Sequence, residues 1–173
     1  MPYAVTHVIL TIVLVDLYRD YWMRNHKRYL TLHTIFLAGV GGVLPDIDYL
    51  LYWLAQTFGY AAQSLTHGGV LHTPIMALPF LAIGYWFWKQ QKHRIAMVFF
   101  AITFGVLFHL VLDYLIWGES GVMWLWPLRD TFYVSPLFQK PVIGDTAFAM
   151  LDGIILLLWL WHEEWKHKIS DYL

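Results

Sequence analysis

Apolar stretches of membrane-spanning length occupy most of this chain and constrain its fold more than any other feature. An α-helix needs about 20 residues to cross the hydrocarbon core of a bilayer. Five stretches are that long or nearly so, and they run from 4 to 22, 29 to 44, 71 to 90, 94 to 117 and 146 to 165. Hydrophobic residues make up 59% of the chain and charged residues 13%, which is not the balance of a soluble domain. The sequence predicts an all-α, polytopic membrane helical bundle of about five transmembrane helices, forming a single domain over residues 1–173.

The segments between these stretches predict the remaining organisation. The second stretch ends at Pro45, so residues 46–58 are predicted to form a separate, short interfacial helix. Residues 118–145 contain Gly118, Gly121, three prolines and the aromatic run Trp124-Leu125-Trp126, which predict a loop on or dipping into the bilayer surface. The N-terminus lacks the basic region and cleavage site of a secretory signal, so we expect the first apolar stretch to be retained.

Positive charges predict the orientation. Lysines and arginines concentrate after the first, third and fifth stretches, and only Arg129 and Lys140 are left for the other side. We therefore expect a multi-pass protein of the cell (inner, cytoplasmic) membrane, with its N-terminus outside and its C-terminus in the cytoplasm. The lipid bilayer is the expected partner. No nucleic-acid partner is expected, because the net charge is −1 and the basic residues form no stripe.

Several histidines and aspartates lie within these apolar surroundings, where ionisable side chains are expensive and therefore rare. The set consists of His7, Asp46, Asp48, His67, His72, His109 and Asp113. All seven fall at the predicted outer ends of the helices, although separate stretches of chain carry them. The chain has no cysteine, so imidazole and carboxylate are the available ligands, and these suit zinc, manganese or iron. The pattern predicts a shared divalent metal site.

Each motif also has a plainer interpretation. His109 and Asp113 have the i,i+4 spacing that places both side chains on one helix face, where they could share a metal or form a buried hydrogen-bonded pair. Asp46 and Asp48 follow Pro45 in a turn. One could bind metal while the other accepts a proton from water, or either could cap a helix.

The remaining two motifs are equally open. His67 and His72 flank a diglycine that would let both imidazoles turn toward one centre. The same segment could instead be a polar loop, with Thr73 near a helix cap and Pro74 in the first turn. His7 could bind metal or be an ordinary hydrogen-bonded histidine near a helix start.

Other polar residues receive simpler predictions. Asp16 is expected to pair with Arg19 at the inner end of the first helix. Asp145 and Asp152 share a face near the start of the last helix and are candidates for further ligands or supporting groups. The following residues are expected to be solvated at the cytoplasmic boundary: His26, His93, His162, His167, Glu163 and Glu164.

Taken in order, these motifs resemble the LexA-binding, inner-membrane-associated metal-dependent hydrolase family, which is related to zinc-dependent phospholipase C. The segments that carry the resemblance are Thr6-His7, Leu44 to Asp48, His67 to Thr73, His109 to Asp113 and Gly121 to Pro127. The resemblance implies that Asp46, His67, His109 and Asp113 form the core metal shell, that His7 belongs to a neighbouring metal position, and that zinc is the usual ion. Gly68, Tyr49 and Ile116 depart from the family pattern, and one or two metals are expected instead of three.

The leading hypothesis is a membrane-embedded, metal-dependent hydrolase of phosphoesters such as lipid phosphates, active at the outer membrane face. Asp48 or His72 would move protons as catalytic groups. The alternative is a membrane protein that binds or transports metal without catalysis. Transporters are expected to place ionisable groups near the middle of the membrane, whereas these crowd at one end.

Overall fold

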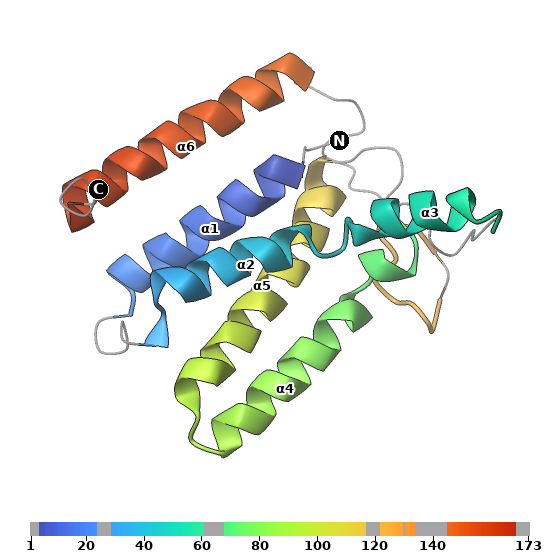
Figure 1. Cartoon of the computed structure of the whole chain (residues 1–173), viewed down its shortest axis with the longest axis horizontal. Helices are drawn as coiled ribbons and strands as arrows, with labels where there is room; N and C mark the ends of the chain where they lie inside the picture. The colour runs from blue at the N-terminus through green and yellow to red at the C-terminus, as the bar shows by residue number, and fades with distance from the viewer. Residues whose placement is uncertain are drawn as a thin grey trace.

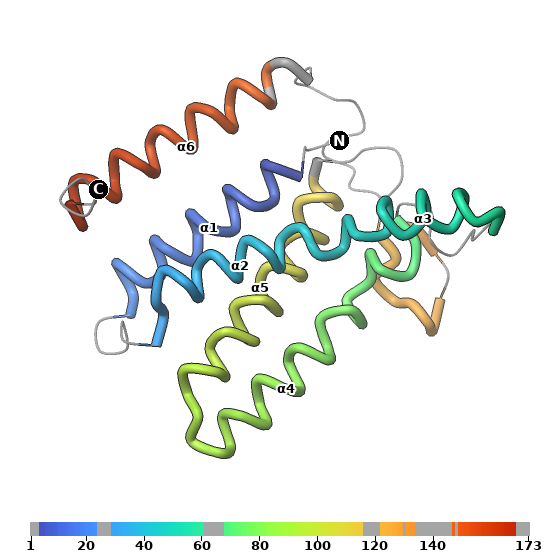
Figure 2. Tube along the Cα trace, viewed as in Figure 1, coloured from blue at the N-terminus to red at the C-terminus, as the bar shows by residue number. Residues whose placement is uncertain are grey.

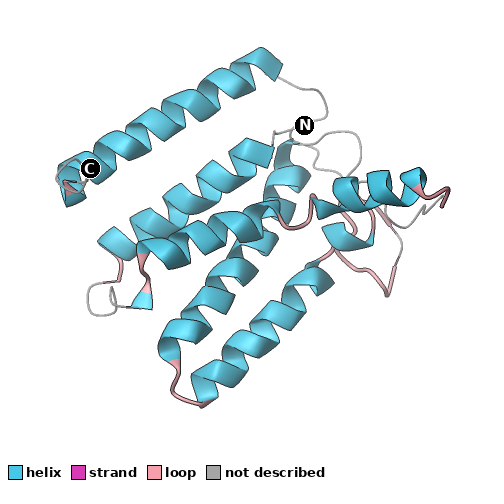
Figure 3. Cartoon of the chain, viewed as in Figure 1, coloured by secondary structure: helices cyan, strands magenta, loops and turns pink. Residues whose placement is uncertain are grey.

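The computed structural model describes residues 4–23, 29–60, 68–116, 122–129, 131–133 and 145–168. These residues form the helices α1 (Ala4–Tyr21), α2 (Leu32–Val43), α3 (Ile47–Thr57), α4 (Leu78–Lys89), α5 (His93–Ile116) and α6 (Asp145–His167). Two short 3-10 turns, η3 (Val70–His72) and η4 (Pro74–Ala77), precede α4. Figure 3 draws helices and loops, and within the described residues the one β contact is the antiparallel pairing of Val122 with Tyr133. The all-α class is confirmed.

The junction between α2 and α3 follows from local sequence. Thr31 caps the start of α2, since its hydroxyl accepts a hydrogen bond from the N–H of Thr34 at 3.3 Å. At the other end Pro45 has no N–H to donate to the helical ladder, and the chain turns there. The axis of α3 consequently bends by 51° from that of α2. The predicted separate helix after Pro45 is thus present as α3.

Glycines allow α2 to approach α1 and α5 closely. A Cβ on Gly105 of α5 would overlap the carbonyl oxygen of Ala38 and the nitrogen of Gly42. A Cβ on Gly41 would lie 2.5 Å from the carbonyl oxygen of Ile102. Backbone therefore packs on backbone here, and a carbonyl of α2 comes within reach of side chains on α5.

The helices lie side by side around α2 and α5 (Figure 1). α2 packs against both α1 and α5, while α4 packs against α5. α6 runs along α1 on the side away from α4, as the tube in Figure 2 also shows. A small apolar core of Val15, Leu30, Ile35, Ala38 and Ala101 fills the space between α1, α2 and α5.

The five predicted membrane spans are not confirmed. Among the described residues, one helix, His93–Leu115, is by itself long and apolar enough to cross a membrane, and α2 with α3 passes as one bent pair. α4 has 12 residues, or about 18 Å of helix, because the predicted stretch from 71 begins as 3-10 turns. α1 is longer, but its second half carries Asp16, Arg19 and Asp20.

Candidate metal centre

Four regions of the fold deliver the predicted site residues to one end of the bundle. His7 lies in the first half of α1, and His109 and Asp113 lie near the end of α5. Asp46, Asp48 and His72 come from the α2–α3 junction, the first turn of α3 and the end of η3. The structure brings these six residues together. The seventh, His67, lies outside the described residues and stays a prediction.

Two of these aspartates lie against the facing imidazoles of His72 and His109, and we call Asp46, His72, His109 and Asp113 the four-residue centre. The Nε2 atoms of His72 and His109 lie 3.2 Å apart. Asp46 Oδ1 lies 3.6 Å from each of these nitrogens, and Asp113 Oδ2 lies 3.5 Å from His72 and 3.0 Å from His109. Tetrahedral zinc, with ligands at about 2.0 to 2.1 Å, separates its donor atoms by about 3.3 Å. The ligand atoms of Asp46, His72 and His109 all lie within 4.8 Å of one another, and so do those of His109, Asp113 and His7, so each set of three could hold a divalent ion.

A backbone contact sets the tautomer of His109. Its Nδ1 lies 2.7 Å from the carbonyl oxygen of Gly42, which can only accept, so Nδ1 carries the hydrogen. In the neutral ring Nε2 is then unprotonated and offers a lone pair, as metal ligation requires. Asp113 Oδ2 lies 3.0 Å from this nitrogen and has no hydrogen-bond donor among the described residues. Two acceptors therefore face each other, an arrangement that either a cation or a hydrogen on Nε2 of His72, 3.2 Å from His109 Nε2, would stabilise.

His72 is oriented in the same way by a carboxylate. Its Nδ1 lies 3.0 Å from Asp48 Oδ2, and both side chains are almost completely buried. Burial opposes a positive charge on the ring, but hydrogen bonds to Asp46 and Asp48 outweigh that effect and raise the pKa of His72 to about 9. Without a metal this imidazole, which precedes α4, carries a proton that an incoming ion must displace.

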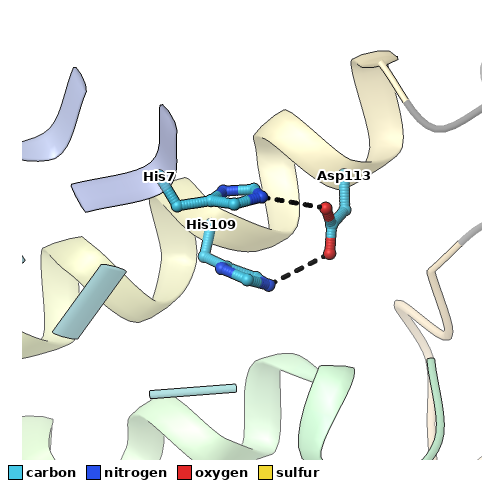
Figure 4. Close-up of side chains that lie close together, drawn as sticks. All are labelled: His7, His109 and Asp113. Atoms are coloured by element: carbon cyan, nitrogen blue, oxygen red, sulfur yellow. Dashed lines mark ion pairs between the residues drawn. The ribbon is translucent and has the colours of Figure 1, made fainter. Parts of the chain in front are cut away.

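His7 lies beside His109 and Asp113 (Figure 4). Its ring stacks on that of His109 with the centroids 4.0 Å apart, and its Nε2 lies 3.3 Å from Asp113 Oδ1. Asp113 thus faces His7 with one oxygen and the four-residue centre with the other. This geometry suits either a hydrogen bond that holds the carboxylate or a second ion shared by His7 and Asp113. The predicted role of His7 as a metal ligand stays a prediction.

Burial limits access to the centre. The side chains of His7, His72, His109 and Asp113 expose between 0% and 4% of their surface, whereas Asp46 exposes 17%. Asp46 is therefore the member that solvent or a substrate can reach.

The structure also decides between some of the alternatives left open by the sequence. Asp46 occupies the N-cap position of α3, but its side chain makes no cap hydrogen bond. The capping interpretation of Asp46 is therefore wrong. Thr73 precedes η4 without a side-chain cap, and its hydroxyl donates to the carbonyl of Val70 at 2.8 Å. Pro74 does stand in the first turn of η4.

Asp145 and Asp152 of α6 were predicted to be further ligands or supporting groups. Asp152 is buried and accepts a hydrogen bond from the Thr6 hydroxyl at 2.8 Å, one residue from His7. It supports α1 at this end and does not join the four-residue centre. The side chain of Asp145 lies outside the described residues.

Sequence reasoning missed one contact of the site. It did not identify the Gly42 carbonyl as the partner of His109, although the paired glycines at 41 and 42 are a signal of close packing.

The pairing of Asp16 with Arg19 is confirmed at 2.7 Å. The expected solvation of Glu163 and His162 is wrong, because α6 packs on α1 and leaves 3% and 15% of these side chains exposed.

The fold and the site define a class of protein. It is all-helical, exposes apolar helix faces and buries a centre of histidine and aspartate side chains. The chain belongs to the YdjM inner membrane protein family, whose model matches residues 1–170. It is also similar to the inner membrane protein YbcI of Escherichia coli (strain K12), with 24% identity over 155 residues, or 78% of this chain and 84% of that protein. No solved structure matches. The inner membrane is thus its location, and the predicted orientation of its termini stays a prediction.

Proposed function

We propose that this protein is a membrane-embedded, metal-dependent hydrolase whose chemistry takes place at the four-residue centre. The observation that carries the proposal is the contact between His109 and Asp113. The unprotonated Nε2 of His109 lies 3.0 Å from an oxygen of Asp113. The same nitrogen lies 3.2 Å from Nε2 of His72 and 3.6 Å from Oδ1 of Asp46. Zinc is the leading candidate, and manganese and iron also suit two imidazoles and two carboxylates.

The bound ion would supply a Lewis acid and an activated water to a phosphoester. Around it, the residues of this chain bind and orient. Gly42 and Asp48 fix the rings of His109 and His72 through their Nδ1 atoms. Asp48 is also the buried base closest to His72, so a proton taken up at the centre could be held on this pair. In this proposal His72 is a metal ligand and Asp48 the group that positions it.

The number of protein ligands bears on catalysis. Four protein donors complete a tetrahedron, and structural zinc sites are closed in that way. Hydrolysis therefore needs an ion that accepts a fifth or sixth ligand at the exposed side of Asp46. A non-catalytic metal-binding protein is the second candidate, and the burial of three of the four ligands favours it.

The proposed substrate class follows from what surrounds the opening. α3 starts next to Asp46 and exposes a run of large apolar side chains: Ile47, Tyr49, Leu50, Leu51, Trp53 and Leu54. Such a helix is suited to the membrane interface, where the headgroup of a lipid phosphate would meet the centre. The choice of phosphoesters also rests on the resemblance to zinc-dependent phospholipase C and to the LexA-binding hydrolase family, which remains part of this proposal.

The test is a hydrolysis screen on purified protein in lipid–detergent micelles, with lipid phosphates and soluble phosphoesters supplied separately. Each assay is run with Zn²⁺ or Mn²⁺. We expect turnover of at least one phosphoester and a loss of at least about 100-fold in His72→Ala, because even outer partners of metal ligands are worth roughly 10 to 100-fold. His93→Ala is the control. Stoichiometric metal without turnover of any phosphoester would overturn the catalytic proposal and leave the structural one.

A further inference from the structure

A second group of ionisable side chains joins α1 to α6 at the end of α1 opposite His7. We call Asp16, Asp20, His162 and Glu163 the α1–α6 cluster. Each offers one ligand atom, and these atoms all lie within 4.8 Å of one another. Asp16 follows His7 by nine residues, or about 13 Å of helix, so this group is separate from the four-residue centre.

The charges of the cluster are not balanced by arginine alone. Asp16 and Glu163 are 0% and 2% exposed, and Asp20 is the third carboxylate. Within the described part of the chain, Arg19 is the one guanidinium in contact, with its Nη2 2.7 Å from Asp16 Oδ1 and its Nε 3.2 Å from Asp20 Oδ1. One positive charge faces three carboxyl groups, and the remaining negative charge can be neutralised by a proton between Glu163 and Asp16, by the histidines or by a bound cation. Burying such charges without compensation is expensive.

The carboxylate oxygens of the cluster also face His162, although Glu163 Oε1 lies 3.7 Å from Nη2 of Arg19 as well. The Nδ1 of His162 lies 3.6 Å from Glu163 Oε1 and 4.0 Å from Asp16 Oδ2. Its Nε2 lies 3.8 Å from Asp20 Oδ2 and 3.4 Å from the hydroxyl of Tyr21. Glu163 Oε1 and His162 Nδ1 are buried and have no hydrogen-bond partner among the residues that the structure describes. A buried carboxylate oxygen and an imidazole nitrogen therefore face the same space without a hydrogen bond to satisfy either.

Neighbouring side chains hold the aspartates in place. Trp159 donates its indole N–H to Asp16 Oδ2 at 3.0 Å. His167 Nε2 lies 2.8 Å from Asp20 Oδ2 and 2.8 Å from Nη2 of Arg19. Because Arg19 can only donate and Asp20 accepts when ionised, no single tautomer of His167 satisfies both contacts. These outer partners resemble those that orient metal ligands elsewhere.

We propose that the α1–α6 cluster binds a divalent transition-metal ion, Zn²⁺ or Mn²⁺, through Asp16, Asp20, Glu163 and His162. The four ligand atoms lie within 4.8 Å of one another, which is wider than the roughly 3.3 Å of tetrahedral zinc, so the side chains close on the ion when it binds. The ion fastens the end of α6 to α1. The outer end of the same helix is held by the Thr6–Asp152 hydrogen bond.

The experiment measures metal per chain by elemental analysis in a His109→Ala background, which removes a ligand of the four-residue centre. The purified full-length protein is equilibrated with Zn²⁺, and in parallel with Mn²⁺, then desalted. We expect His109→Ala to retain about one equivalent of one of the two metals and His109→Ala/Glu163→Gln to lose it, with at least a tenfold weaker affinity. His109→Ala/Glu164→Gln is the matched control, since Glu164 is the adjacent, half-buried carboxylate outside the cluster.

Equal metal in the two double variants, one carrying Glu163→Gln and the other Glu164→Gln, would overturn the proposal, as would no metal in the His109→Ala background. A second measurement uses the unmutated protein, so it tests the proposal even if the variants misfold. Hydrogen exchange of the unmutated protein should slow in residues 158–168 when metal is added, and an unchanged exchange rate there would equally overturn it. Neither result depends on whether the four-residue centre binds metal or hydrolyses a phosphoester.

Discussion

His109 donates its Nδ1 hydrogen to the carbonyl oxygen of Gly42 across a distance of 2.7 Å, although 67 residues separate them. This contact joins the helix packing to the chemistry of the centre. α2 reaches α5 closely enough to present that carbonyl because Gly41, Gly42 and Gly105 carry no side chains. The contact also leaves His109 Nε2 free to ligate, since the carbonyl keeps the proton on the other nitrogen.

Gly105→Ala tests the packing that brings the carbonyl to His109. The added Cβ would overlap the carbonyl oxygen of Ala38 and the nitrogen of Gly42, so the helices must separate. We expect the free energy of unfolding to fall by about 1 to 3 kcal/mol, as in other overpacked cores. Thermal or denaturant unfolding in detergent measures the change.

Gly153→Ala is the matched control, because a Cβ at Gly153 in α6 would meet nothing within 4 Å. Alanine favours a helix over glycine by about 1 kcal/mol, so this variant should be as stable as the wild type or more so. Equal destabilisation by the two substitutions would contradict the close packing of α2 on α5.

Asp48→Asn tests whether the buried carboxylate acts through His72. Asparagine keeps the size of the side chain but not its charge, and it can present an N–H to Nδ1 in place of an acceptor. We expect zinc affinity, measured by competition with a chelator, to fall by roughly 10 to 100-fold while the helix content stays the same. An unchanged affinity would show that Asp48 does not orient His72.

Thr6→Val tests the attachment of α6 at the end of α1 that carries His7. The substitution removes the hydroxyl that donates to Asp152 at 2.8 Å and leaves that carboxylate buried without this partner. We expect a loss of about 1 to 3 kcal/mol in the free energy of unfolding. Thr57→Val is the control, because the Thr57 hydroxyl bonds the carbonyl of Trp53 on an exposed surface. If both valine variants unfold alike, the Thr6–Asp152 contact does not hold α6.

The sequence predicted most of the helices because long apolar stretches show where they lie. α1, α5 and α6 begin and end within two residues of their predicted limits. The start of α4 was missed, since the apolar residues from 71 to 77 have the composition of a helix but fold as η3 and η4. The number of membrane spans is not confirmed by the described residues, because a short or charged helix can belong to an apolar stretch.

The candidate site was predictable where local spacing determines geometry. The i,i+4 interval of His109 and Asp113 requires them to share a face, and their 3.0 Å contact follows from it. The partners of His72 and His109 were not predictable, because Asp48 and Gly42 reach these rings only through the packing of separate helices. For the same reason the sequence wrongly placed Glu163 in solvent: its burial depends on α1, which lies far away along the chain.

The most direct test of the account is the metal content of the purified protein beside that of His109→Ala. His93→Ala serves as the control, because His93 starts α5 at the opposite end from Asp113 and contacts Gln91. After equilibration with Zn²⁺ and desalting, we predict that His109→Ala holds at least about one equivalent less than the wild type and that His93→Ala holds the same amount. Equal zinc in all three proteins would contradict the claim that His72, His109, Asp46 and Asp113 form a metal centre.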